Sequence, residues 1–167
     1  MACDPHSGLQ ALLPRLYGFA RTMLSDSDAA RDLVQEAATR ALAARRVPTD
    51  AAAYRAWMFR IVRNAALDEI QRRKRPAPDV AASVDLWAFD DASIAKITVE
   101  QGLANLPAAH REIISLIDIA GFSYGEAAEL LQVPVGTVMS RVARARGALL
   151  ATIEASSVRP LKSNHGT

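Results

Sequence analysis

The chain has 167 residues, which suits one domain of average size or two small ones. Half of its residues are apolar but only 5% are aromatic, and the alanine-rich sequence with helical spacing predicts an all-α protein. A net charge of +2 excludes a uniformly basic chain, and the single cysteine, Cys3, excludes a disulfide framework within the chain and a cysteine metal site.

The N-terminus and the scattered histidines exclude further classes. Residues 1–6 have no basic start and no apolar core, so no signal peptide is expected. The longest apolar stretches are interrupted by charge, as by Asp118, so no membrane span is expected. Because His6, His110 and His165 are scattered, neither a zinc site nor another cofactor is predicted. The expected compartment is a reducing cytoplasm.

Apolar residues at helical spacing predict two helices in the first part of the chain. Pro14 falls inside the first run, so that helix either begins near Leu13, with Pro14 in its first turn, or kinks there. Residues 26–28 form a break with capping side chains. The second helix is expected to bury Ala30, Leu33, Val34, Ala37 and Ala41 and to expose Asp32, Gln35, Glu36 and Arg40.

A third long helix is predicted from about Ala51 to Arg75, with Asp50 as its N-cap. Its exposed side carries seven basic residues against two acidic ones, a net charge of +5. Cations bind phosphates and aromatic rings stack on unpaired bases, so this side fits a single nucleic-acid strand. Its expected buried stripe is Tyr54, Trp57, Met58, Ile61, Val62, Ala65 and Ile70.

A plainer interpretation of the same helix stays open. Tyr54 and Trp57 can be ordinary core residues, and the basic run at 72–75 can be a solvated helix end that the helix dipole favours. For Trp57 alone this interpretation is preferred, whereas for the whole basic side it is not.

An acidic linker is predicted over residues 77–93, after Pro76 and Pro78 stop the helix. It is not a purely polar tether, because it contains an apolar patch. The patch either docks onto the protein's own domains or a partner, or forms a short helix packed on the neighbouring domain. Its members are Val84, Leu86, Trp87 and Phe89.

Two further helices around Pro107 are expected to form a scaffold for a helix-turn-helix. Ser123 and Glu126 make a capping box for the first helix of that motif, and Pro134 ends it. The second helix is expected to bury Val135, Val138, Val142, Ala145 and Leu149.

The opposite face of this last helix is small or basic. It carries Gly136, Thr137, Ser140, Ala143 and Arg144, and no acid occurs between Glu129 and Glu154. Such a face suits a DNA major groove, because small side chains allow close approach while hydroxyls and arginines bind phosphates and base edges. An ordinary helical hairpin with a solvated basic face is the alternative.

Three blocks, in this order, resemble the extracytoplasmic-function sigma factors, the small two-domain initiation subunits of bacterial RNA polymerase. Together they cover most of residues 12–150, and the last block is the most specific. They are residues 30–36 with 40–42, similar to the polymerase-binding helix; 56–64 with 66–68 and 72–73, similar to the helix that opens promoter DNA; and 106–107, 122–128, 134–141 and 144–146.

The resemblance implies two small helical domains. Sigma region 2, over residues 8–76, would bind core polymerase and the −10 element, and sigma region 4, over 94–155, would bind the −35 element through its helix-turn-helix. The linker at 77–93 would thread toward the polymerase active centre and RNA exit path. A polar tail at 156–167 is expected to be disordered.

The resemblance also implies roles for individual residues. The polymerase-binding residues would be Asp32, Gln35 and Glu36, with the first two facing the β′ clamp helices. The loop over residues 47–54 would pocket a flipped base, and the −10 residues would be Tyr54, Trp57, Arg60, Arg63 and Asn64. The −35 residues would be Tyr124, Pro134, Gly136, Thr137, Met139, Ser140, Arg141, Ala143 and Arg144.

The chain departs from the family pattern at a few positions. Ala37 and Ala38 stand where the family often has a bulky residue, and Ala143 is smaller than usual. The sequence at residues 13–16 and 134–141 looks most like that of the general-stress branch of α-proteobacteria. Further partners implied by the family are the β flap of polymerase, promoter DNA in double- and single-stranded form, and an anti-sigma factor that clasps both domains.

Two other functions compete with this interpretation. One is a helix-turn-helix regulator that binds duplex operators without polymerase, although such a regulator has no need for a single-strand surface around Trp57 and Asn64. The other is a DNA enzyme, but no carboxylate cluster, Ser/His/Asp set or metal-ligand spacing supports it. The chain is therefore expected to have no catalytic residues.

Overall fold

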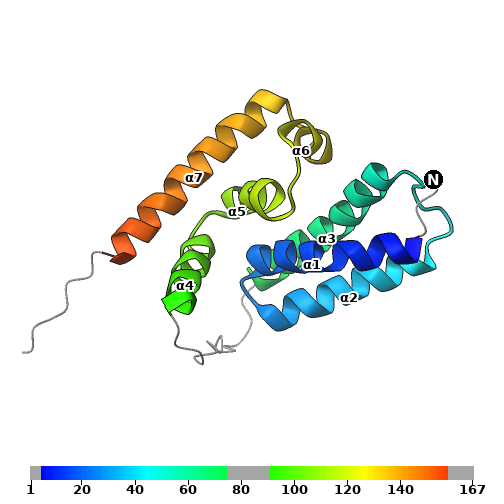
Figure 1. Ribbon diagram of the computed structural model, residues 1–167, viewed down its shortest axis with the longest axis horizontal. Helices are drawn as coiled ribbons and strands as arrows, with labels where there is room; N and C mark the ends of the chain where they lie inside the picture. Colours follow the sequence, from blue (N-terminus) through cyan, green and yellow to red (C-terminus); the bar gives the residue numbers. More distant parts are fainter. Residues whose placement is uncertain (1–4, 75–90, 158–167) are drawn as a thin grey trace, which may run out of the picture.

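A computed structural model of the protein describes residues 5–74 and 91–157. The described chain is helical and has no strand, which confirms the expected all-α class. Figure 1 shows two groups of helices side by side, α1–α3 and α4–α7. In order, the elements are α1 (Pro5–Leu24), α2 (Ser27–Ala43), α3 (Ala51–Arg73), α4 (Asp91–Ala104), α5 (Ala108–Ile114), the π-helical turn η1 (Ser115–Ile119), α6 (Tyr124–Leu131) and α7 (Val135–Ser157).

Several sequence predictions lie outside the described residues. These concern Cys3, the linker patch around Trp87 and Phe89, and most of the tail. Two tail residues are described, and Ser156 and Ser157 continue α7, so the predicted tail begins too early. None of the helices in the two described ranges has the length and apolar character needed to cross a membrane.

The first helix begins earlier than one of the two predictions allowed. α1 starts at Pro5, and Pro14 lies in its interior, so a start near Leu13 is wrong. A proline inside a helix removes one backbone hydrogen bond. The buried stripe that follows it, with Leu16, Phe19 and Met23 fully covered, supplies the apolar burial that outweighs this loss.

Capping side chains fix the other two helices of the first group. Asp26 accepts hydrogen bonds from the backbone N–H groups of Asp28 and Ala29 at 3.0 and 3.1 Å, and α2 buries the five residues predicted for it. Asp50 accepts from the N–H of Ala53 at 2.9 Å and so starts α3, as predicted. Arg73, near the end of α3, reaches back to Asp26 at 3.0 Å and closes the three-helix bundle.

The buried side of α3 differs in part from the predicted stripe. Tyr54, Met58 and Val62 are buried as expected, whereas Phe59 and Ala66 were missed. Phe59 escapes an intrahelical pattern because it faces the second group of helices. The remaining predicted members, Trp57, Ile61, Ala65 and Ile70, are only partly buried.

The second group places a capped helix-turn-helix on a scaffold of α4 and α5. Ser123 and Glu126 make the predicted reciprocal capping box of α6. Gln132 then adopts a left-handed conformation with φ of 54°, which turns the chain toward α7. Val138, Val142 and Ala145 are buried as predicted, but Val135 is 44% exposed, so the buried stripe of α7 begins one turn later than expected.

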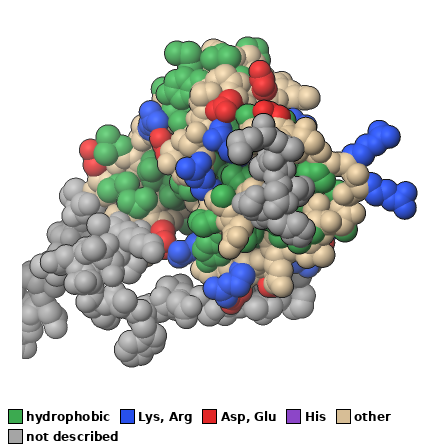
Figure 2. All heavy atoms as spheres, turned by 45° about the vertical axis from the view of Figure 1, so that its right-hand side comes forward, with side chains coloured by type: hydrophobic (Ala, Val, Ile, Leu, Met, Phe, Trp, Pro, Cys, Tyr) green, Lys and Arg blue, Asp and Glu red, His purple; other side chains and the backbone are tan. Residues whose placement is uncertain are grey.

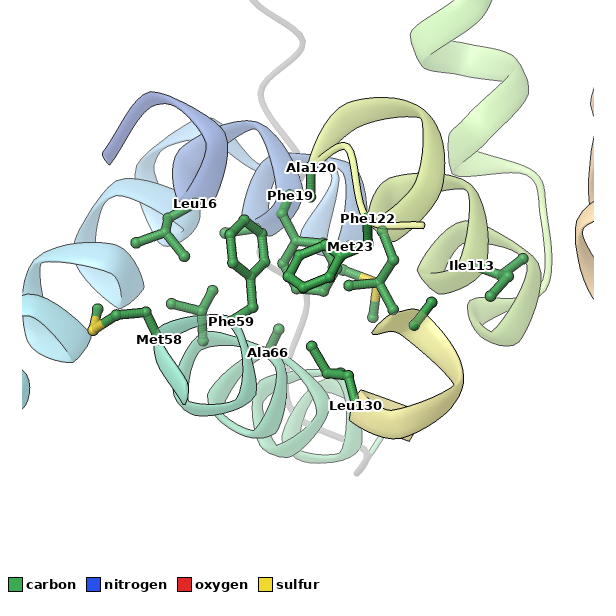
Figure 3. Packing of buried hydrophobic residues seen from close by; sticks show 14 of the residues in the cluster. Leu16, Phe19, Met23, Met58, Phe59, Ala66, Ile113, Ala120, Phe122 and Leu130 are labelled. Atoms are coloured by element: carbon green, nitrogen blue, oxygen red, sulfur yellow. The ribbon is translucent and has the colours of Figure 1, made fainter. Parts of the chain in front are cut away.

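The two groups share one apolar core. The ring of Phe59 lies 5.6 Å from that of Phe19 and 4.9 Å from that of Phe122, both edge to face, so an aromatic row crosses the boundary (Figure 3). Beside it, α1 approaches η1 closely: a Cβ at Gly18 would lie 3.1 Å from Cγ2 of Ile119. The candidate site therefore rests on two bundles that are packed against each other.

We expect Phe59→Ala to destabilise the chain by about 3–5 kcal/mol, because it empties the centre of this aromatic row. Urea unfolding followed by circular dichroism measures the change. Leu150→Ala, at a residue that is more than half exposed, is the matched control and should change stability by less than about 0.5 kcal/mol. A loss below about 1 kcal/mol for Phe59→Ala would show that the row is not a core feature.

The Asp26 carboxylate gives a pH-dependent prediction. The hydrogen bond from Ala29, with the charge of Arg73 adding to it, lowers the pKa of Asp26 below its ordinary value of 3.8. A depressed carboxyl pKa stabilises the fold above the unfolded-state pKa and loses that effect as pH falls through the folded-state value. Asp26→Asn keeps the cap but removes the charge.

Because the Asp26 side chain is 44% exposed, solvent screening limits the loss in Asp26→Asn to about 1 kcal/mol or less at neutral pH. Urea midpoints measured between pH 7 and pH 3 should converge for variant and wild type at the acid end. Asp28→Asn, at the neighbouring carboxylate, is the control. A difference that persists undiminished at pH 3 would contradict this account.

Candidate nucleic-acid interface

The helix-turn-helix is held by the capping box before α6. The Ser123 Oγ accepts from the N–H of Glu126 at 3.2 Å, and Glu126 Oε2 accepts from the N–H of Ser123 at 2.8 Å. This backbone hydrogen bond from Ser123, against the opposing effect of desolvation, lowers the pKa of Glu126. The charged carboxylate therefore holds the first turn of α6 in place.

The outer face of α7 is open to solvent where the sequence predicts DNA contacts. Met139, Ser140, Ala143 and Arg144 are exposed. Arg144 folds back along its own helix, donating from Nε to the Ser140 carbonyl at 3.3 Å and from Nη2 to Ser140 Oγ at 3.2 Å. No carboxylate meets this guanidinium within the described residues, so its charge is available to an acceptor.

Two backbone donors at the beginning of α7 are already used within the helix. The N–H groups of Thr137 and Val138 both donate to the carbonyl of Pro134, at 2.9 and 3.2 Å. Gly136, earlier in the first turn, is exposed and keeps the helix-terminal position that suits a phosphate. Tyr124, Thr137 and Arg141 are partly exposed, and Pro134 is exposed, so every predicted −35 residue reaches the surface.

The flank of this face is less basic than its sequence suggests. Arg146 Nη2 pairs with Asp118 Oδ1 of η1 at 2.6 Å, and this hydrogen bond raises the pKa of the Arg146 guanidinium. Arg146 is therefore held to the scaffold, and the cations left to this face are the exposed Arg144 and the partly exposed Arg141.

The predicted −10 residues on α3 are divided between surface and core. Arg60 and Asn64 are exposed and Trp57 is partly exposed, whereas Tyr54 is 2% exposed. The centre of the Tyr54 ring lies 5.7 Å from that of the Trp57 ring, so the buried tyrosine packs against the partly exposed tryptophan. In this arrangement Tyr54 does not present its ring to a base, in line with the core interpretation of that residue.

Most of the basic side of α3 is paired with carboxylates. Arg72 and Arg73 both bind Glu69, and the hydrogen bond from Arg72 is the main reason that the pKa of Glu69 is lowered. Arg55 and Arg63 are paired as well, with partners in the second group of helices. Among the described residues of this side, Arg60 and Lys74 have no ion-pair partner, while Arg75 lies outside them.

This pairing could not be read from the sum of charges on one helix, because three of the carboxylates come from other elements. The surface reflects it: on the face in Figure 2, Lys and Arg side chains are interspersed with Asp and Glu and do not form one continuous basic field.

The three predicted polymerase-binding residues share the exposed side of α2. Asp32, Gln35 and Glu36 are all exposed, and Glu36 is paired with Arg40 on the next turn. Leu42, 49% exposed at the end of the same helix, lies in the block that resembles the polymerase-binding helix but was not among the predicted contact residues. Its signal was available, since Leu42 falls outside the inward stripe of α2 and seven residues after Gln35, on the same face.

Comparison with known proteins identifies both groups of helices. Residues 9–76 match the family model for Sigma-70 region 2, and residues 97–149 match that for Sigma-70, region 4. The chain is 35% identical over 147 residues to an ECF RNA polymerase sigma factor, EcfG, of Rhodopseudomonas palustris, covering 86% of this chain and 81% of that protein. It is 37% identical over 140 residues to a probable RNA polymerase sigma-C factor of Mycobacterium bovis, covering 78% and 74%.

Solved structures agree with these relatives. A co-crystal structure of the sigma factor RpoE with the anti-sigma factor NepR from Bartonella quintana matches with a TM-score of 0.69 and 31% identity, over 89% of this chain and 96% of that one. CnrH in complex with the cytosolic domain of CnrY matches with a TM-score of 0.66 and 28% identity, over 91% and 90%. With both region models matched in order and curated relatives aligned over most of its length, the chain belongs to the ECF sigma factors, which direct bacterial core RNA polymerase to promoters.

Proposed function

We propose that this sigma factor reads the −35 element with the exposed face of α7. The observation that carries this proposal is the Ser140–Arg144 pair, a hydroxyl and a guanidinium held together on an exposed helix face with no acid beside them. A guanidinium can donate two hydrogen bonds to a guanine edge, and a small residue such as Ala143 lets the helix backbone approach the groove. Thr137 and Gly136 lie where phosphates flank that groove.

On region 2, we propose that Trp57, Arg60 and Asn64 face the separating −10 strand. All three reach the surface of α3, and Arg60 has no ion-pair partner among the described residues. A flat ring can stack on an unpaired base, and the exposed cation can bind a phosphate. Arg63 belongs to the same proposed surface but is engaged elsewhere in this arrangement.

The exposed side of α2 is proposed to bind the β′ clamp helices. Asp32 and Gln35 supply polar contacts there, and Leu42 at the end of the same face adds an apolar one. An exposed leucine beside charged residues is the composition expected of an interface that forms in water and excludes it on assembly.

Control by an anti-sigma factor is proposed because two solved structures that resemble this chain are complexes, one with the anti-sigma factor NepR and one with the cytosolic domain of CnrY. A role in the general stress response is proposed from the resemblance of residues 13–16 and 134–141 to that branch. The chain is proposed to act in the cytoplasm as a subunit without catalytic residues. A regulator that works without polymerase is not favoured, because region 2 of a sigma factor has no role in such a protein.

Transcription in a purified system tests this function. Core polymerase with the wild-type chain should produce run-off transcripts from genomic DNA fragments that core enzyme alone does not produce. Asp32→Arg should abolish co-purification with core polymerase and these transcripts, while circular dichroism stays unchanged, because the substitution places a cation on the exposed docking face.

Glu154→Arg makes the same change of charge at an exposed position on α7 and is the control, which should keep both activities. Unchanged association of the Asp32→Arg variant would remove α2 from the interface. Transcripts that do not depend on the added chain would contradict the proposed function as a whole.

The −35 assignment predicts a sequence-dependent loss. Arg144→Ala should weaken binding to the cognate −35 duplex by about 1–3 kcal/mol and relax discrimination at one base position. Fluorescence anisotropy at fixed salt, with a panel of single-base variants of the duplex, measures both effects. Arg15→Ala, an exposed arginine on α1 of region 2, controls for the loss of one charge. An equal loss on every sequence would assign Arg144 to a phosphate instead.

A further inference from the structure

In this arrangement the two regions cannot contact both promoter elements at the same time. This inference rests on the proposed function. The −35 and −10 positions are about 25 base pairs apart, which is about 85 Å along straight DNA at 3.4 Å per pair. In the structure, Arg55 Nη2 on α3 lies 2.9 Å from Glu126 Oε1 on α6, the helix that precedes the recognition helix. The two regions must therefore separate before both elements are bound.

Two ion pairs from α3 join the regions at this boundary, and a third, between Arg21 of α1 and Glu100 of α4 at 3.1 Å, joins them at its edge. Arg63 Nε of region 2 donates to Glu112 Oε1 of region 4, and the two side chains are only 23% and 10% exposed. Arg55 pairs with Glu126 and also lies 4.2 Å from the centre of the Phe122 ring. Both arginines project from the side of α3 that carries the aromatic row, so the ion pairs and the rings form one continuous contact.

The two arginines are the cations that α3, the promoter-opening helix, would otherwise offer to nucleic acid. A carboxylate and a phosphate bind a guanidinium in the same way, through charge-assisted N–H to oxygen hydrogen bonds. Arg63 is in the proposed −10 surface, and Arg55 lies two turns before it on the same helix. Neither is available to a DNA strand while region 4 holds it.

We propose that this sigma factor latches itself closed: Glu112 and Glu126 of region 4 occupy Arg63 and Arg55 of the promoter-opening helix in place of DNA phosphates. Opening the regions and freeing the single-strand surface are then one equilibrium within the chain. A ligand that binds the open form shifts it by its preference for that form.

The two carboxylates contribute differently to the latch. Glu126 also caps α6, so its interaction with Ser123 exists whether the chain is open or closed. Glu112 is a buried carboxylate on α5 whose ion pair is with the other region. Neutralising Glu112 leaves Arg63 partly buried beside an uncharged group in the closed form, whereas water solvates Arg63 in the open form. The closed form is therefore the one that is penalised.

The test is a pair of variants of the full chain. Glu112→Gln with Glu126→Gln removes both charges, keeps the size of each side chain, and leaves a residue that still serves in a capping box. Glu129→Gln with Glu154→Gln makes the same change of net charge at two exposed positions of region 4 and is the matched control. Small-angle X-ray scattering of the purified proteins should give a larger radius of gyration for the latch variant only.

Single-strand binding gives a second measurement. If the open form of the wild type is a minor state of about 10% or less, opening it fully tightens apparent affinity about tenfold or more. The probe is a fluorescein-labelled strand of about twelve thymidines, which stacking surfaces bind without sequence preference. The latch variant should bind it about tenfold more tightly than the control at the same salt concentration.

A charge swap separates the ion pair from a general effect of charge. Arg63→Glu combined with Glu112→Arg restores the pair in reverse and should return the radius of gyration to the wild-type value, while Arg63→Glu alone should raise it. If the latch variant fails to fold by circular dichroism, Glu126→Gln alone gives the same comparison, because that side chain is 43% exposed. Equal radii and equal affinities for the folded variant and its control would overturn the proposal.

The scattering result does not depend on polymerase. A chain that opens as expected but directs no transcription would contradict the proposed function and leave the latch standing. A chain that directs transcription but shows no change in radius on removal of the carboxylates would contradict the latch alone.

Discussion

The row of Phe19, Phe59 and Phe122 is the interaction on which the rest of the arrangement depends. It joins α1 and α3 of region 2 to the segment before α6 of region 4, through two edge-to-face contacts. Aromatic rings in this geometry add to the free energy of area burial and fix the relative rotation of what they join. Because Phe122 directly precedes the cap at Ser123, the row also sets where the helix-turn-helix begins.

Charge pairing gives this apolar boundary its selectivity for one arrangement. Apolar contact alone allows many packings, whereas a partly buried arginine tolerates only a position with an acceptor in reach. Arg55 and Arg63 find their acceptors in region 4, and Arg73 finds its own at Asp26 within region 2. The basic side of α3 is thus divided between holding its own bundle and holding its neighbour.

Local features of the chain were predictable because local chemistry determines them. Asp26, Asp50 and the Ser123–Glu126 box cap the helices that the sequence assigns to them, and the inward face of α2 follows from spacing alone. The exposure of the outer face of α7 was also predicted. Phe59, Glu112 and the pairing of Arg55 and Arg63 were not, because each depends on a partner 49 or more residues away, on an element whose placement no periodicity encodes.

The π-helical turn η1, between α5 and the helix-turn-helix, has a consequence for how this chain can vary. A π turn holds one residue more than the α-helical turn it replaces, so removing a residue from Ser115–Ile119 would restore a regular helix. Each residue of an α-helix advances the chain by about 100° around its axis. In a regular α-helix a deletion therefore turns everything downstream by that angle, whereas the loss of the extra residue of η1 closes the π turn and leaves the direction of the flanking helix nearly unchanged. The π turn is thus the point before the helix-turn-helix at which the chain can lose one residue with the least change of register.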